Sequence, residues 1–196
     1  MKKLYLTLLA FCIISIASAS TVFQGYLITK SGDRLTGYFT NIVYTGYYSQ
    51  VVFINDFGTA YEIQPELIKA FVFRKENDFL VYESKRLGGN WVFLKVLYKG
   101  DGLNLYRSPE NRTRFIVAGR KVETKEYKAE EYYVQKPGSR LKRLRKLNYR
   151  KRLRKLMKER APELAKKIGS KGYKFADLPT IIREYNDICE RTRFKL

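Results

Sequence analysis

The sequence contains no histidine and only two cysteines, Cys12 and Cys189. The absence of histidine removes the commonest general base and the commonest metal ligand of proteins. Cys12 lies in an N-terminal segment that we expect to be cleaved off, so one cysteine remains and cannot form an internal disulfide. Phosphate-binding loops, dinucleotide fingerprints, G-x-S-x-G elbows and metal-ligand spacings are also missing. We therefore expect a non-enzymatic protein that uses no cofactor and no metal.

Paired carboxylates are the one pattern that leaves catalysis open. Glu62 lies four residues before Glu66, and Glu130 is followed directly by Glu131. Two carboxylates can hydrolyse a glycosidic bond, which keeps a hydrolase of the glycoside hydrolase type as an alternative. In a β-rich protein such pairs are usually surface charges, so this alternative ranks behind binding.

Residues 1–19 have the features of a secretory signal peptide. Lys2 and Lys3 precede an apolar run over residues 4–16, and Ala17-Ser18-Ala19 is an A-x-A cleavage site. The run is shorter than the ~20 apolar residues that a transmembrane helix needs. We therefore expect the chain to be exported and the segment to be cleaved off. The mature chain would begin at Ser20 and contain no transmembrane helix.

Residues 22–136 show the pattern of successive β-hairpins. Alternating apolar and aromatic runs are separated by turns rich in Gly, Asp and Asn, which tolerate the positive φ of tight hairpins. Four hairpins are expected around residues 31–33, 55–58, 75–78 and 99–102, and residues 114–118 would pair with residues 131–135 to close the series. Successive hairpins with short links predict an antiparallel β meander, curled into a sandwich or an open barrel.

Most tyrosines of this region recur along the expected strands, where aromatic side chains pack across a sheet. Tyr44, Tyr47 and Tyr48 differ because they surround Gly46 in an expected loop. Exposed aromatic rings can stack on sugars or bases. These three residues are therefore the candidate loop for a small ligand or a glycan, which is a second alternative function.

Residues 139–174 hold most of the net charge of the chain. This basic segment contains sixteen Lys or Arg and two acidic residues, Glu159 and Glu163, and so carries +14 of the formal +20. Residues 20–138 sum to +4 and residues 175–196 sum to zero. Like charges three or four residues apart on a helix repel by roughly 0.3 kcal/mol per pair. The concentration of one sign therefore suggests a compensating anion.

The leucines predict that the basic segment is helical. Leu141, Leu144 and Leu147 share one face of a helix. A second face, rotated from the first, is shared by Leu153, Leu156, Met157, Leu164 and Ile168. One straight helix cannot present both faces to one core, so we expect a break near Asn148, which is a suitable N-cap.

Proline and glycine residues further along the chain predict two more helices. Pro162 fits the first turn of a short helix, which Gly169 and Gly172 would end, and residues 177–191 fit a last helix. The expected fold class is therefore α+β. A signal peptide (residues 1–19) would precede a β-rich domain (residues 20–138) and a basic helical region (residues 139–196) of two or three helices.

The order of several short motifs resembles a group of largely uncharacterised exported envelope proteins of Bacteroidetes-type bacteria. The motifs are GY (25–26), KSGD (30–33), TGY (36–38), YES (82–84), FLKVL (93–97), LNLY (103–106), YYV (132–134) and YN (185–186). In that group a β-rich domain followed by helices occurs alone or ahead of an outer-membrane β-barrel. The resemblance implies a location in the periplasm or outer-membrane periphery of a Gram-negative bacterium. It also implies a role in binding or assembly, and it supplies no catalytic residues.

These observations favour an exported, non-catalytic envelope protein that binds through a basic helix. The partner would be another envelope protein or an anionic surface of lipid or lipopolysaccharide. We expect no nucleic acid, because the protein is exported and Tyr149 is the only aromatic residue between Arg140 and Lys171. The candidate binding residues are Arg140, Arg143, Arg145, Lys146, Arg150, Lys151, Arg154, Lys155 and Lys158.

Overall fold

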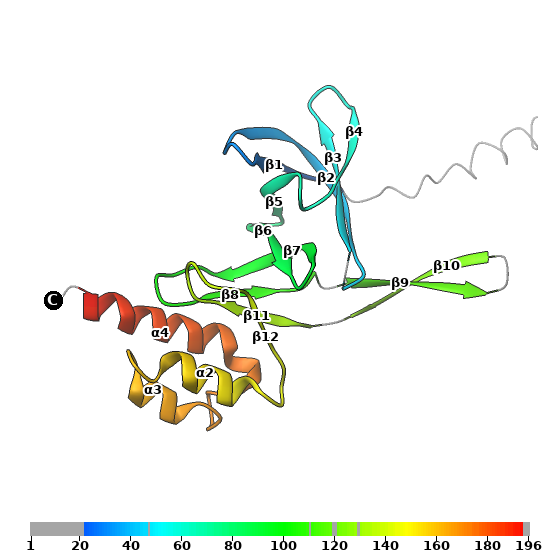
Figure 1. Ribbon diagram of the computed structural model, residues 1–196. Helices are drawn as coiled ribbons and strands as arrows, with labels where there is room; N and C mark the ends of the chain where they lie inside the picture. The colour runs from blue at the N-terminus through cyan, green and yellow to red at the C-terminus, as the bar shows by residue number, and fades with distance from the viewer. Residues whose placement is uncertain (1–21, 47, 110, 119–120, 129, 194–196) are drawn as a thin grey trace, which may run out of the picture.

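A computed structural model describes residues 22–46, 48–109, 111–118, 121–128 and 130–193 (Figure 1). An antiparallel sheet curls into a half-barrel, and a small layer of helices packs against one end of it. This arrangement confirms the predicted α+β class. The expected signal peptide lies outside the described residues.

The main sheet has ten strands in the order β12-β11-β8-β7-β6-β5-β1-β2-β3-β4. Every pair of neighbouring strands is antiparallel. The strands are β1 (Phe23–Thr29), β2 (Arg34–Tyr44), β3 (Ser49–Asn55), β4 (Ala60–Ile63), β5 (Ile68–Lys75), β6 (Asp78–Leu87), β7 (Asn90–Tyr98), β8 (Asn104–Arg107), β11 (Tyr132–Gln135) and β12 (Lys142–Leu144). The four hairpins predicted from their turns are confirmed as β1–β2, β3–β4, β5–β6 and β7–β8.

The short link between β4 and β5 requires the sheet to curl. β5 pairs with β1, so three strands separate it from β4 within the sheet. In a flat sheet these four spacings would cover ~19 Å, about the full reach of the extended chain from Ile63 to Ile68. Curling shortens this span and encloses an aromatic core. Within it, the Phe71 ring stacks on Phe39 at 5.1 Å and on Tyr82 at 5.0 Å.

One predicted strand pairing is wrong. Residues 114–118 do not pair with residues 131–135, because β9 (Asn111–Ala118) pairs with β10 (Lys121–Lys128) in a separate two-stranded ribbon. β11 instead pairs with β8 on one side and β12 on the other. The sequence of β10, KVETKEYK, is mostly polar. It lacks the run of apolar and aromatic residues that marks the other strands. The ribbon projects from the body of the protein (Figure 1).

The predicted helix at the start of the basic segment is also wrong. Residues 142–144 form the edge strand β12, which pairs with β11 through Val134↔Lys142 and Tyr132↔Leu144. Leu144 is buried, whereas the side chain of Leu147 is 99% exposed. The spacing of the leucines therefore fitted a helix by chance. Backbone pairing with β11 determines the conformation of residues 142–144.

The break near Asn148 is confirmed, and three helices follow it. They are α2 (Tyr149–Met157), α3 (Pro162–Lys167) and α4 (Leu178–Arg193), and the 3₁₀ turn η1 (Phe175–Asp177) precedes α4. Pro162 occupies the first turn of α3 as predicted. Gly169 and Gly172 have φ of 103° and 79°, conformations that favour glycine where a helix stops. Asp177 accepts a hydrogen bond from the Lys174 N–H at 2.8 Å in the 3₁₀ turn.

The helices share a second apolar core with the β8–β11–β12 end of the sheet. Leu153 and Met157 of α2 and Ile181 and Ile182 of α4 are fully buried there. Cys189 is buried in the same core as a free thiol. Within the described part of the chain, no helix combines the length and apolar character needed to cross a bilayer.

Candidate anion-binding surface

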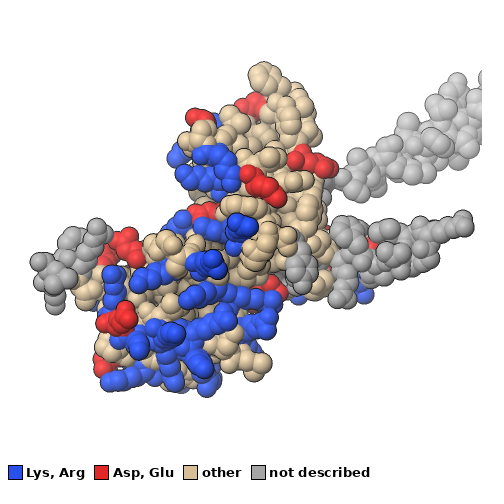
Figure 2. Space-filling view, in the orientation of Figure 1, with Lys and Arg blue, Asp and Glu red and all other residues tan. Residues whose placement is uncertain are grey.

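All sixteen Lys and Arg side chains of the basic segment are exposed. Figure 2 shows that Lys and Arg crowd the surface of the helical layer, whereas the half-barrel carries both signs. The concentration of charge in the sequence is therefore also a concentration in space, over α2, α3 and the loops around them.

The geometry of α2 separates its apolar side from a charged side. Tyr149, Leu153 and Met157 are the buried residues of the helix. With about 3.6 residues per turn, Lys151, Lys155 and Lys158 project from the opposite side. Arg150 and Arg154 fall between these two sides. When the apolar side of α2 packs on the core, its three lysines therefore face directly outward.

Two arginines of the predicted set, Arg143 and Arg154, are bound to the protein itself. Arg143 forms an ion pair with Glu131, with 2.5 Å between Nη2 and Oε1, and Glu131 also accepts a hydrogen bond from the Tyr133 hydroxyl at 2.7 Å. Burial raises the pKa of Tyr133 well above its usual value. Arg154 donates to the Ile168 carbonyl at 2.7 Å. These contacts attach β12 to the sheet and α2 to the end of α3, so they are structural.

Arg150 is exposed and lies beside Tyr149 and Gly169. Its guanidinium lies 5.9 Å from the centre of the Tyr149 ring. A Cβ atom at Gly169 would lie 2.9 Å from the Arg150 Nε, so the glycine leaves room for this side chain. Arg152, which was not among the predicted residues, donates to the Arg143 carbonyl.

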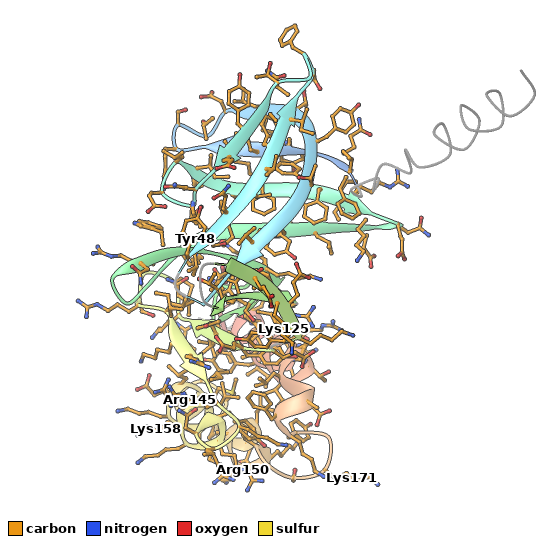
Figure 3. All side chains as sticks on the ribbon, turned by 90° about the vertical axis from the view of Figure 1, so that its right-hand side faces the viewer. Tyr48, Lys125, Arg145, Arg150, Lys158 and Lys171 are labelled. Carbon is orange, nitrogen blue, oxygen red and sulfur yellow. The ribbon has the colours of Figure 1, made fainter. Side chains whose placement is uncertain are left out.

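The other predicted cations form no ion pair within the described residues. They are Arg140, Arg145, Lys146, Lys151, Lys155 and Lys158. Arg140 precedes β12, and the other five lie on α2 or in the turn before it. We call Arg145, Lys146, Lys151, Lys155 and Lys158 the basic face. Figure 3 shows Arg145 and Lys158 projecting from the same side of the helical layer.

A hydrogen-bonded turn holds the start of the basic face in place. The N–H groups of Asn148 and Tyr149 both donate to the Arg145 carbonyl at 2.9 Å. The Asn148 Oδ1 accepts from the Arg145 N–H at 2.9 Å, so this side chain closes the turn and does not cap α2. Leu147 lies in this turn with its side chain in solvent. Sequence reasoning assigned Leu147 to an apolar core face, and the exposed side chain contradicts that assignment.

An open groove of about 620 Å³ lies between α2 and α3. Arg154, Lys155, Lys158 and Lys166 line it together with Pro162 and Ala165. Lys166 forms an ion pair with Glu163 at 2.8 Å, and this hydrogen bond lowers the pKa of the Glu163 carboxyl. The groove continues the basic face onto α3. Its four cations and small apolar floor suit a phosphate or carboxylate group better than an apolar ligand.

The candidate tyrosine loop does not form a single surface among the described residues. Tyr44 ends β2 and is fully buried with Val92, Leu94, Tyr106 and Tyr133. Tyr48 is 41% exposed, and its hydroxyl donates to the Gln50 side chain. Burial, followed by the charges of Glu62 and Glu66, raises the pKa of Tyr48. Tyr47 lies outside the described residues.

A half-enclosed apolar pocket of about 460 Å³ opens elsewhere on the half-barrel, between the β1–β2 and β3–β4 turns. Leu27 and Phe53 form its buried floor, while Leu35, Phe57 and Tyr61 are exposed at its walls. Sequence reasoning missed this pocket, because its lining comes from four strands whose curvature no local pattern specifies.

The carboxylate pairs occupy two different settings. Glu131 is buried and bound to Arg143 and Tyr133, whereas Glu130 is exposed and lies 3.7 Å from the Arg107 Nη1. Glu62 and Glu66 are both exposed on β4 and the loop after it. No group of three or more Cys, Asp or Glu side chains suited to a metal ion occurs among the residues that the structure describes.

Comparisons with family models, with characterised protein sequences and with solved structures gave no match to the chain.

Proposed function

We propose that this protein is a non-catalytic, exported component of the bacterial envelope that binds an anionic partner through the basic face. The proposal rests on a difference between two groups of cations in the basic segment. Arg143, Arg152 and Arg154 are engaged with protein acceptors, whereas the five residues of the basic face project outward without an ion pair in the described chain.

The arrangement of these five charges supports binding over a passive surface. Lys151 and Lys155 are four residues apart on α2, and Lys158 at the C-cap follows Lys155 by three residues. Such like-charged pairs each cost roughly 0.3 kcal/mol. A passive helix surface usually mixes signs, and Glu159 is the only acidic residue from residue 140 to residue 160. An anionic partner would remove this repulsion and increase the rate of association.

The test is a crosslinked pull-down of the tagged mature protein from its native envelope fraction, at low and at high salt. The test variant carries the substitutions R145Q, K146Q, K151Q, K155Q and K158Q, which neutralise the basic face. It keeps Arg143, Arg152 and Arg154. The matched control changes K69Q, K75Q, R86Q, K125Q and K136Q, five exposed cations outside the basic segment.

Both variants lose the same formal charge, so a general effect of net charge would affect them equally. We expect the wild type and the control to recover the same partner at low salt and the test variant to lose it. High salt should weaken recovery by the wild type, because exposed charges are screened. Equal recovery by all three proteins would overturn the proposal.

A further inference from the structure

Leu147 stands out among the apolar side chains of the basic segment. Its side chain is 99% exposed, and it is the only large apolar residue at residues 139–174 that the structure places fully in solvent. Leu141 and Leu156 are half-buried, and Leu144, Leu153 and Leu164 are buried. An isolated exposed leucine is common on protein surfaces, so its surroundings determine what it means.

The surroundings of Leu147 are the basic face itself. Arg145 and Lys146 precede it in the same turn, and Lys151 lies four residues after it. Because the Tyr149 N–H donates to the Arg145 carbonyl, the turn leads directly into α2 with helical hydrogen bonding. Leu147 therefore lies about one helical turn ahead of Lys151, about two ahead of Lys155 and about three ahead of Lys158. Extending the 3.6-residue period of α2 back to residue 147 places the leucine on the side of these lysines.

The turn that carries Leu147 is fixed by three hydrogen bonds, from the N–H groups of Arg145, Asn148 and Tyr149. The leucine is thus held in a defined turn directly before α2 and its cations. A soluble polyanion would gain from the cations alone and would leave Leu147 in water. A protein interface would require a larger apolar centre than one side chain.

We infer that the partner of the basic face is the surface of an anionic lipid bilayer, into which Leu147 inserts between the head groups. This inference rests on the proposed function and names its partner. The cations contact lipid phosphates, and the leucine reaches the apolar layer directly beneath them, a combination that interfacial helices also use. One inserted side chain makes the attachment reversible and dependent on salt.

The test uses the mature protein with vesicles of phosphatidylglycerol and phosphatidylethanolamine, compared with vesicles of phosphatidylcholine alone, in a sedimentation assay. The wild type should bind the anionic vesicles and not the neutral ones. The five-residue variant of the basic face should bind far more weakly, by roughly five-fold for each charge removed. Leu147→Ser should bind roughly ten-fold more weakly than the wild type. The matched charge control should bind like the wild type.

Insertion itself is measured with a polarity-sensitive dye on Leu147→Cys. Cys189 is buried, so a thiol reagent labels the new cysteine selectively. The control dye is placed on Phe79→Cys, which is exposed on β6 outside the basic segment. We expect the emission of the dye at residue 147 to shift to the blue on anionic vesicles, and the emission of the dye at residue 79 to stay unchanged.

The outcomes separate this inference from the proposed function. If the pull-down depends on the basic face but the protein ignores anionic vesicles, the lipid inference fails and the proposed function stands. If vesicle binding depends on the five cations but Leu147→Ser binds like the wild type without a dye shift, insertion is overturned. If neither assay responds to loss of the basic face, both proposals fail.

Discussion

Glu83 on β6 is a half-buried carboxylate held between two lysines. The Lys85 Nζ lies 2.8 Å from its Oε2 and the Lys99 Nζ lies 2.5 Å from its Oε1. The Tyr106 hydroxyl donates to Oε2 at 3.2 Å. Burial alone would raise the pKa of Glu83, but the hydrogen bonds and charges of the two lysines outweigh it and lower the pKa below the usual 4.5.

This lowered pKa predicts a contribution to stability that depends on pH. The unfolded chain binds the proton more readily than the folded protein, so the contribution is complete above about pH 4.5 and is lost as pH falls through the lower folded pKa. Glu83→Gln should reduce the free energy of unfolding at pH 7 and flatten its decline at acidic pH. Urea unfolding from about pH 7 to about pH 3 measures both effects, with Glu123→Gln on β10 as an exposed control. Parallel curves for the wild type and Glu83→Gln would contradict the prediction.

At the scale of elements, α4 is attached to the β7–β8 turn by the side chain of Asn186. Its Oδ1 accepts from the N–H groups of Gly102 and Leu103 at 2.8 and 3.0 Å, and its Nδ2 donates to the Leu103 carbonyl at 2.9 Å. A Cβ atom at Gly100 would lie 2.3 Å from the Asn186 Oδ1, so glycine is required for this close approach.

Asn186→Ala should therefore destabilise the protein by about 3 kcal/mol, because two buried N–H groups lose their acceptor. The midpoint of urea unfolding should fall without a change in the slope of the transition. Glu190→Ala, an exposed change on the same helix, should leave the midpoint nearly unchanged. An Asn186→Ala protein as stable as this control would show that water replaces the lost acceptor.

Local chemistry explains which elements could be predicted from the sequence. Glycine and aspartate in the turns specified the four hairpins, and Pro162, Gly169 and Gly172 specified the limits of α3. Interactions between distant residues explain the errors. β12 is a strand because β11 offers it a partner, although Leu141, Leu144 and Leu147 have helical spacing.

The basic face, too, could be predicted from the sequence only in part. The excess of charge was visible in the sequence, but the partners that separate structural from outward cations were not. Glu131 lies twelve residues before Arg143, and the acceptor of Arg154 is a backbone carbonyl at Ile168. The exposure of Leu147 depends on a turn whose hydrogen bonds close around Asn148.

At the scale of the whole molecule, the ten-stranded sheet includes strands from both predicted parts of the chain. The boundary predicted after residue 138 falls between β11 and β12, which are neighbours in this sheet. The side chains of Leu103, Leu105 and Val134 on the sheet side are at most 1% exposed, in the core that α2 and α4 complete. The helical layer therefore carries the basic face and also covers the end of the sheet.

A chain that ends at residue 138 tests whether the β-rich part is stable by itself. Without β12 and the helices, β11 becomes an open edge and the apolar side chains around Leu105 meet water. Both features favour association between chains. We expect this shortened protein to aggregate or to lose cooperative unfolding, as measured by size-exclusion chromatography and by thermal unfolding followed with circular dichroism.

The full-length variant of the basic face is the matched control, because it removes charge from the helical layer and keeps the cover on the sheet. It should remain monodisperse and unfold cooperatively. A shortened chain that does the same would establish residues 20–138 as an autonomous domain. The helical layer would then serve the basic face alone. If the shortened chain fails while the control folds, the helices both complete the core and present the charge, because their buried and outward faces belong to the same few turns.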